Sequence, residues 1–376
     1  MKKLFLLLFC LSVTGTVFAQ EKKAKPKIGV VLSGGGAKGL AHIGVLKVLE
    51  EAGIEISYIG GTSMGAIVGG LYASGYSATE LDSIFRSLDA DALLRDFTPR
   101  GSKNFFEKRN DEMYALQLPF KNFKIGFPTA FSKGLYNYTT VNKLTEHVRH
   151  IRDFNKLPIP FVCIATDIET GREVVLRKGV LPDAILASGA FPSLYAPVEI
   201  EGRLLIDGGV TNNYPIEEVR KMGADIIIGV DVQDPLKTRD QIKGATGVLV
   251  QINNYQMIQK MEAKSAATDI YIKPDISGFT VISFDDGRAI IDKGEEAARK
   301  IIDELTPLGT GAPLVKKRIP AQDSLFVEEI RIKGLKNYTR SYVIGKLNFK
   351  PGTKITYEDF NSGITSLNAT QNFTSI

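Results

Sequence analysis

Two kinds of apolar pattern alternate along most of the chain. Lys27–Ser33 is a short, continuous apolar run that ends at a row of glycines, which is typical of a strand buried in a parallel sheet. Lys38–Ala52 carries apolar residues at every third or fourth position, which is typical of a helix, and Gly53 stands where a helix often ends. This alternation predicts a mostly parallel sheet with helices on both faces, an α/β/α unit of three layers.

The alternation continues to Leu305. Further strands are expected at Ile56–Gly60, Phe161–Asp167, Val174–Arg177, Val198–Glu201, Arg203–Ile206, Asp225–Val232 and Ile270–Lys273. Further helices are expected at Met64–Ser74, from Ser77 to about Asp89, from Pro182, within Gln241–Ala267 and at Arg288–Leu305. We therefore place one large α/β domain at residues 27–305.

Residues 1–19 have the three parts of a secretory signal peptide. Two lysines precede an apolar run at positions 4–11, and Val-Phe-Ala at positions 17–19 offers a cleavage site after Ala19. A retained membrane anchor is the alternative, but the run is shorter than the roughly 20 apolar residues that a spanning helix needs. We expect export to the outer membrane, the cell surface or the medium. Cleavage leaves Cys163 as the only cysteine, so no intramolecular disulfide can form.

Length and charge narrow the class of protein. The chain has 376 residues, which suits one large domain and a smaller appendage, and a formal net charge of +5. This charge is too small to indicate a nucleic-acid partner. Residues 306–324 are rich in proline and glycine and read as a linker, after which a new pattern starts at Leu325.

A Gly-x-Ser-x-Gly motif follows the strand expected at Ile56–Gly60. Gly61 and Gly65 flank Ser63, and a helix is expected to start at Met64. A serine in this strand-to-helix turn is presented at the edge of the sheet, as a nucleophile requires. The alternative is a turn of small residues that lets the helix pack closely.

A glycine-rich turn follows the first expected strand. Gly34-Gly35-Gly36-Ala37-Lys38-Gly39 would expose several backbone N–H groups at the start of a helix, where they can bind a phosphate or an oxyanion. A dinucleotide-binding protein of the Rossmann type is a second possibility, but it would carry an acidic residue at the end of the second strand. That strand ends in Gly60-Gly61 instead.

The third motif is Asp207-Gly208-Gly209, directly after an apolar strand. An isolated Asp-Gly often does no more than start a tight turn. A triad on this fold would place its histidine after the acid, but His42, His147 and His150 all precede Asp207. We expect His42 to be packed and the other two histidines to lie on a solvated face. A carboxylate must then activate the serine directly, which requires burial that raises its pKa.

Together the three motifs resemble the patatin-like phospholipase family over Lys27–Leu305. The segments Ala187–Pro192 and Gly208–Pro215 are similar to family blocks as well. The resemblance implies that Ser63 is the nucleophile, Asp207 the base of a Ser-Asp dyad, and Gly35 and Gly36 the main donors of the oxyanion hole. Gly34, Lys38 and Met64 complete that hole, and the remaining motif positions are Gly39, Gly61, Gly65, Gly208 and Gly209. One departure is Lys38, where many members carry arginine.

The C-terminal pattern is similar to the start of a POTRA domain. The resemblance rests on residues 327–334, a segment at 342–347, Phe349–Gly352 and a helix at Tyr357–Leu367. A strand is expected at Phe326–Ile332, a first helix near Thr339–Lys346, and a second strand that begins near Asn372. The family resemblance implies that an outer-membrane barrel follows in cis beyond residue 376. An unrelated small α+β cap is the alternative.

The favoured function is hydrolysis of glycerophospholipid esters through an acyl-enzyme, with no metal and no cofactor. The partner would then be a phospholipid or a membrane interface. Alternatives are an esterase or thioesterase with soluble substrates, and a barrel-linked passenger without catalytic activity. Aromatic residues gather between positions 105 and 138 and suggest an acyl-binding or interfacial rim, or else a loop packed on the core. They are Phe105, Phe106, Phe120, Phe123, Phe127, Phe131, Tyr136 and Tyr138.

Overall fold

A computed structural model describes residues 25–95, 120–121, 124–125, 130, 132–242, 244–316, 320, 323–370 and 372–373. The expected signal peptide lies outside these residues, and so do Phe105, Phe106, Phe123, Phe127 and Phe131 of the aromatic stretch. In the described part no helix is both long and apolar enough to cross a membrane.

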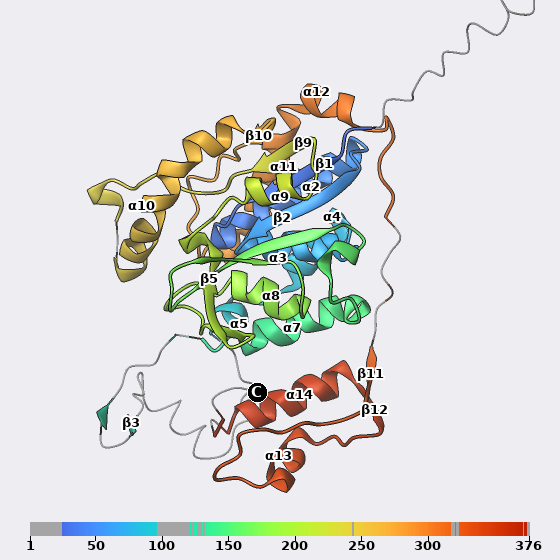
Figure 1. Cartoon of the computed structure of the whole chain (residues 1–376), viewed down its shortest axis with the longest axis vertical. Helices are drawn as coiled ribbons and strands as arrows, with labels where there is room; N and C mark the ends of the chain where they lie inside the picture. The colour runs from blue at the N-terminus through green and yellow to red at the C-terminus, as the bar shows by residue number, and fades with distance from the viewer. Residues whose placement is uncertain are drawn as a thin grey trace, which may run out of the picture.

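The central sheet is mostly parallel, as the sequence predicts (Figure 1). Its strand order is β10-β9-β1-β2-β5-β8-β7, and β6 pairs with β5 outside this path. The parallel strands are β1 (Ile28–Leu32), β2 (Ile56–Thr62), β5 (Phe161–Asp167), β9 (Ile226–Val230) and β10 (Ile270–Ile272). Antiparallel pairing begins beyond β5, with β6 (Glu173–Leu176), β8 (Arg203–Asp207) and β7 (Val198–Ile200).

Helices cover both faces of the sheet. One large apolar core contains residues of α2 (Ala41–Glu51), α3 (Met64–Ala73), α8 (Leu181–Ser188) and α11 (Gly287–Arg299). The other face is covered by α9 (Ile216–Lys221), which packs on β1, β2 and β9 around Val31, Val162 and Val219. Further helices in the described part of this domain are α4 (Ala78–Ser87), α5 (Ala90–Arg95), α7 (Leu135–Thr145), α10 (Gly244–Ala266) and α12 (Ile302–Leu305). The three-layer α/β/α architecture is confirmed.

Helix boundaries follow the local signals with two differences. Gly53 adopts a φ of 74° after α2, and the Ser77–Glu80 capping box starts α4. The helix expected at Lys38–Ala52 instead begins with a 3₁₀ turn at Gly36–Leu40, and the one expected at Arg288–Leu305 is interrupted between α11 and α12.

The C-terminal residues form a small unit with its own core. β11 (Ser324–Val327) pairs antiparallel with β12 (Thr353–Thr356), and α13 (Arg340–Leu347) packs against α14 (Tyr357–Asn368). Both helices match their expected positions. The strand expected at Phe326–Ile332 is wrong in its bounds, because β11 ends at Val327. Its partner β12 precedes α14 and was not expected. The second strand expected to begin near Asn372 lies mostly outside the described residues. The short strands β3 (Phe120–Lys121) and β4 (Lys124–Ile125) form a separate pair.

Candidate active site

Ser63 occupies a tight turn between β2 and α3. Its φ of 55° and ψ of −126° place it in a region that residues other than glycine rarely adopt. The flanking glycines are required by close backbone approach: a Cβ on Gly61 would lie 2.3 Å from the Gly65 carbonyl oxygen, and one on Gly65 would lie 2.2 Å from the Leu32 carbonyl oxygen. The turn therefore holds Ser63 in a strained, partly exposed position directly after β2.

The Ser63 hydroxyl meets the Asp207 carboxylate. Ser63 Oγ donates a hydrogen bond of 2.6 Å to Asp207 Oδ2, and the Gly209 amide donates one of 2.7 Å to Asp207 Oδ1. A Cβ on Gly208 would lie 2.1 Å from the Ile164 carbonyl oxygen, so only glycine allows the turn after the acid to pass this closely. Both carboxylate oxygens are thus fixed, and one of them is aimed at the serine.

The end of α8 fixes the backbone of both residues. The Ser63 amide donates to Ser188 Oγ at 3.0 Å, and the Asp207 amide donates to the Ala190 carbonyl at 2.9 Å. The sequence did not single out either residue as part of the site. Both belong to the segment Ala187–Pro192, and the resemblance of this segment to a family block was the signal that could have indicated their role.

Burial tunes the Asp207 carboxylate. Only 3% of the residue is exposed, and this burial raises its pKa to about 6, while the hydrogen bonds from Ser63 and Gly209 act in the opposite direction. At neutral pH the group is therefore ionised, but it is more basic than an ordinary aspartate. These are the properties that a general base for a serine hydroxyl needs.

The glycine-rich turn lies directly beside Ser63. A Cβ on Gly34 would lie 2.8 Å from Ser63 Cβ and 2.2 Å from Asn213 Oδ1, and Gly36 adopts a φ of 57°. Among the described residues, no loop or cap hydrogen bond is donated by the amide of Gly35 or Gly36. These two N–H groups are therefore available to an oxyanion next to the serine.

Asn213 secures this turn from the other side. Its side chain donates to the Gly34 carbonyl at 3.1 Å, and the Gly34 amide donates back to the Asn213 carbonyl at 3.2 Å. Asn213 follows Asp207 closely in the chain, so the same short segment supports the acid and the glycine-rich turn. It lies in the second block of family resemblance, Gly208–Pro215, but no motif predicted a role for this residue.

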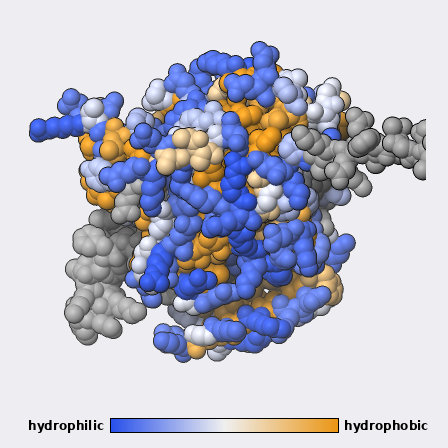
Figure 2. Space-filling view, turned by 45° about the horizontal axis from the view of Figure 1, so that its top comes forward, coloured by the Kyte–Doolittle hydropathy of each residue, from blue (hydrophilic) through white to orange (hydrophobic). Residues whose placement is uncertain are grey.

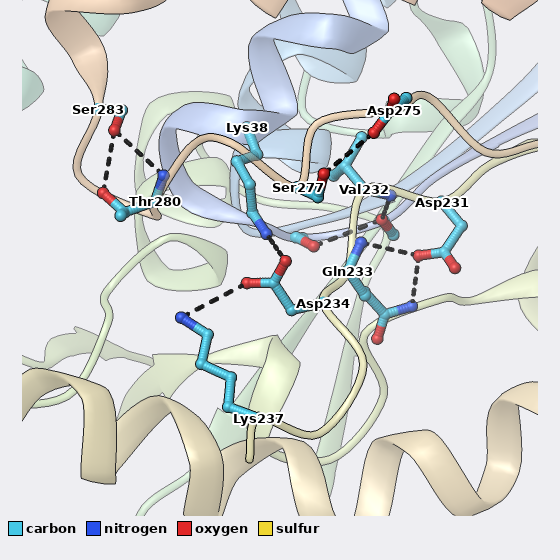
Figure 3. Close-up of polar contacts among 12 residues, drawn as sticks. Lys38, Asp231, Val232, Gln233, Asp234, Lys237, Asp275, Ser277, Thr280 and Ser283 are labelled. Atoms are coloured by element: carbon cyan, nitrogen blue, oxygen red, sulfur yellow. Dashed lines mark hydrogen bonds and ion pairs between the residues drawn. The ribbon is translucent and has the colours of Figure 1, made fainter. Parts of the chain in front are cut away.

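Lys38, which is expected in the oxyanion hole, belongs to the glycine-rich turn, and its ammonium is paired with an acid. Its side chain is almost fully buried and its ammonium forms an ion pair with Asp234, as Figure 3 shows. Lys237 Nζ lies 3.9 Å from the other carboxylate oxygen of Asp234. Burial lowers the pKa of Lys38, while Asp234 opposes this shift. The positive charge beside the glycine-rich turn is thus compensated by an acid that the sequence did not indicate.

None of the histidines contacts the dyad in the described residues. His42 is fully buried with Nε2 2.8 Å from the Ser33 carbonyl oxygen, and burial lowers its pKa to about 4. It is a packed residue, as expected. His147 is not on a solvated face, because it packs edge-on against Tyr76 with Nε2 2.9 Å from the Ser74 carbonyl oxygen. His150 is exposed.

Ser63 and Asp207 open into a large, mostly apolar cavity. Its volume is about 720 Å³, and the glycine-rich turn and Met64 line it beside the dyad. Apolar residues of α3, α4, α7 and α8 form one wall, and Tyr138 is the member of the aromatic stretch that lines it in the described part. Within the same ranges no group of His, Cys, Asp or Glu is close enough to hold a metal ion. The space suits an acyl chain with its ester at Ser63.

Comparison with known proteins identifies the family. The sequence model of the patatin-like phospholipase family matches residues 30–220. A patatin-like phospholipase domain-containing protein of Caenorhabditis elegans is 32% identical over 307 residues, which cover 74% of this chain and 21% of that protein. An uncharacterized NTE family protein of Mycobacterium bovis is 33% identical over 212 residues, 56% of this chain and 50% of that protein.

Two further matches extend the comparison. Lysophospholipase NTE1 of Coccidioides immitis is 29% identical over 314 residues, which cover 76% of this chain and 18% of that protein. The chain thus spans half or less of the length of these relatives. Among solved structures, VipD from Legionella pneumophila aligns with 15% identity and a TM-score of 0.41, covering 74% of this chain and 67% of that one.

Proposed function

Because the chain belongs to the patatin-like phospholipase family, we propose that it hydrolyses acyl esters of glycerophospholipids through an acyl-enzyme on Ser63. The observation that carries this proposal is the 2.6 Å hydrogen bond between Ser63 Oγ and a buried carboxylate at the wall of an apolar cavity. A nucleophile, a base with a raised pKa and free N–H donors are the parts that acyl transfer requires.

The first half of the proposed reaction forms the acyl-enzyme. Ser63 Oγ attacks the ester carbonyl while its proton passes to Asp207, and the amides of Gly35 and Gly36 stabilise the oxyanion, with Gly34 and Met64 beside them. When the tetrahedral intermediate collapses, the bond to the leaving alcohol breaks and Asp207 returns the proton to that oxygen. Ser63 then carries the acyl group as an ester.

The second half regenerates the enzyme. Asp207 takes a proton from water, the hydroxide attacks the acyl carbonyl, and the same N–H groups stabilise the second oxyanion. Collapse releases the fatty acid and gives the proton back to Ser63 Oγ. The sequence of steps balances without a metal or a cofactor.

A lipid substrate is favoured over a small soluble ester by the cavity. Its volume of about 720 Å³ and its apolar walls provide more room than a short acyl group fills. The alternative of an esterase or thioesterase uses the same dyad. The test is to incubate the purified 20–376 chain with mixed phospholipid vesicles and to measure both free fatty acid and lysolipid. Turnover of soluble esters with no release from vesicles would exclude the phospholipase.

Export stays a proposal that rests on residues 1–19. We infer that the chain is cleaved after Ala19, because the basic start, the apolar run and the small residue at the cleavage site occur in the right order. Expression of the whole reading frame in a bacterium with an outer membrane tests this. Mass spectrometry should find Gln20 at the mature N-terminus, and an intact Met1 on a cytoplasmic product would contradict it.

A POTRA-like role for residues 325–376, and a barrel in cis beyond them, are proposals too. The small unit packs α13 and α14 over a two-stranded sheet and has a separate core that includes Val343, Leu347 and Phe349. A complete unit of the kind proposed would add a third strand. Sequencing the reading frame past Ile376 tests both points, since strands of about ten residues with alternating polarity should follow. A stop codon there in the native gene would remove the barrel.

A further inference from the structure

Helix α10 exposes apolar side chains to solvent along one face. Val248, Ile252 and Tyr255 share one face by their spacing and are 46%, 56% and 50% exposed, whereas Gln251 and Asn254 on the adjoining face are buried. A surface helix normally turns its apolar face to the core and its polar face to water. The outward face of α10 therefore requires an apolar partner.

The buried polar residues fix this orientation. Gln251 accepts a hydrogen bond of 2.9 Å from the Lys237 amide and donates one of 3.1 Å to the Lys237 carbonyl. Met257 is buried on the same side of the helix. Rotating α10 to hide its apolar face would leave two backbone groups and one amide side chain without partners, which would be unfavourable. The exposure is thus built into the fold.

The apolar surface continues into the catalytic cavity. Leu249 and Ile282 are both exposed, and both line the cavity that contains Ser63 and Asp207. Leu236 is exposed next to the residue that Gln251 holds. We define the α10 apolar face as Leu236, Val248, Leu249, Ile252, Tyr255 and Ile282. Figure 2 shows apolar surface on the left of the molecule, the side on which α10 lies in Figure 1.

The exposed charged residues around this face show no clear excess of basic or acidic groups. On the chain segments that carry this face, Arg239 and Lys260 are exposed, but so are Asp240 and Glu262. Attraction to an anionic surface would need a clear excess of basic groups. The partner is therefore expected to be bound by apolar contact, largely independent of its charge.

We propose that the α10 apolar face is the surface by which this protein lies on a lipid bilayer, with the mouth of its cavity against the membrane. The inference rests on the proposed lipid hydrolysis. An acyl chain could then move from the bilayer into the cavity past Leu249 and Ile282 without crossing water, which would cost free energy for every methylene exposed. A second copy of the chain on this face would instead cover the cavity mouth, so a bilayer is the better occupant.

Binding to vesicles tests the surface separately from catalysis. The Ser63→Ala chain is mixed with phosphatidylcholine vesicles and the bound fraction is measured by flotation, with and without the double change Ile252→Ser/Tyr255→Ser. We expect the double variant to bind at least about tenfold more weakly, because two half-exposed apolar side chains no longer leave water. Binding of the parent should persist at high salt.

The matched control removes exposed apolar side chains elsewhere. Val315 and Phe326 are 94% and 57% exposed and lie in the linker and the C-terminal unit. Val315→Ser/Phe326→Ser should bind vesicles as the parent does. Equal loss in both variants, or unchanged binding of the Ile252→Ser/Tyr255→Ser variant, would overturn the proposal.

Activity and size in solution complete the test. With Ser63 intact, Ile252→Ser/Tyr255→Ser should slow hydrolysis of vesicle lipid by about tenfold or more and leave kcat/KM for a soluble short-chain ester within about twofold. If the parent hydrolyses neither substrate, the proposed function fails, while vesicle binding still decides the docking surface. A parent that is dimeric without lipid, and monomeric as the double variant, would assign the α10 apolar face to a second copy and refute the bilayer.

Discussion

Ser63 and Asp207 meet although their strands are not neighbours and run in opposite directions. Strand β5 lies between β2 and β8, with Thr62 paired to Ile164 and Asp207 paired to Ala165. Because β8 is antiparallel to β5 and stops at Ala165, its carboxyl end lies at the level of the carboxyl end of β2. The hydroxyl and the carboxylate can therefore bridge across β5 with a hydrogen bond of 2.6 Å.

Replacing the nucleophile should separate activity from stability. Ser63→Ala should abolish ester hydrolysis and labelling by a fluorophosphonate, because it removes the hydroxyl that forms the acyl-enzyme in the proposed mechanism. Ser63→Gly should be inactive as well but more stable by about 1 kcal/mol, since glycine adopts a φ of 55° without strain. Thermal unfolding measures the second effect. Labelling at another residue, or a less stable glycine variant, would contradict this account of the turn.

Asp207→Asn should reduce kcat by about 100-fold or more, because an amide does not accept the serine proton. The amide oxygen can still accept the hydrogen bond from Gly209, so the fold should be retained. The control is His147→Gln/His150→Gln, which should keep most of the activity. Loss of activity in that control, with normal unfolding, would revive a mechanism that uses histidine.

The pH dependence follows from the burial of Asp207. Its pKa is raised to about 6, so kcat/KM for a soluble ester should rise with pH, reach half its maximum near pH 6 and level off above it. A pH–rate profile from pH 4.5 to 8.5 measures this. A half-maximum near pH 4 would mean that the acting carboxylate is not buried in this way.

The same shift predicts how stability changes with pH. The pKa of Asp207 is higher in the folded state than its ordinary value of 3.8, so the folded protein binds this proton more tightly than the unfolded chain does. The resulting stabilisation is complete below pH 3.8 and is lost as the pH rises through about 6. Between pH 4 and 7 the free energy of unfolding of Asp207→Asn should therefore rise relative to that of the parent, by up to roughly 3 kcal/mol. Denaturant unfolding at each pH tests the sign, and a constant difference would contradict it.

The architecture of the large domain was predictable because each buried strand is a continuous apolar run that ends at a polar residue or glycine. Phe161–Asp167, for example, has the same bounds in the sequence prediction and in β5. In the C-terminal unit this signal fails. Thr353–Thr356 is short and polar, and it forms β12 only because β11 supplies its hydrogen-bond partners.

The chemistry of the candidate site was only partly readable from the sequence. The motifs predicted Ser63, Asp207 and the glycine-rich turn as parts of the site, because each of them follows a strand that the sequence predicts. The partner of Lys38 could not be found in this way, because Asp234 lies far along the chain in a loop without a motif. The outward face of α10 was missed for a related reason: apolar positions alone do not reveal that Gln251 is the residue turned inward.

A single methyl group next to the dyad should disturb catalysis. Gly34→Ala would place Cβ 2.8 Å from Ser63 Cβ and 2.2 Å from Asn213 Oδ1, so the serine or the turn must shift. Shifts of this size at reacting atoms reduce rates strongly, and we expect kcat to fall by at least about tenfold. Gly278→Ala is the control, because nothing lies within 4 Å of its added Cβ. Normal kcat in Gly34→Ala would show that the turn does not constrain Ser63.

Substitutions of Lys38 and Asp234 should have non-additive effects on the free energy of unfolding. Lys38 is 1% exposed, so Asp234→Asn leaves a buried ammonium without its counter-charge and should cost about 3 kcal/mol. Lys38→Met/Asp234→Leu removes both charges and should cost less than the sum of the single changes, which a double-mutant cycle measures.

Lys237→Met supplies the control for this cycle. Lys237 Nζ lies 3.9 Å from Asp234, and 28% of its side chain is exposed to solvent, which screens the interaction. We expect a loss below about 1 kcal/mol. Because Asp234→Asn also removes the group that keeps Lys38 charged, the pKa of Lys38 should fall further and the cost of the substitution should shrink as pH rises. Additive effects, or a cost that grows with pH, would mean that Lys38 is stabilised by something other than Asp234.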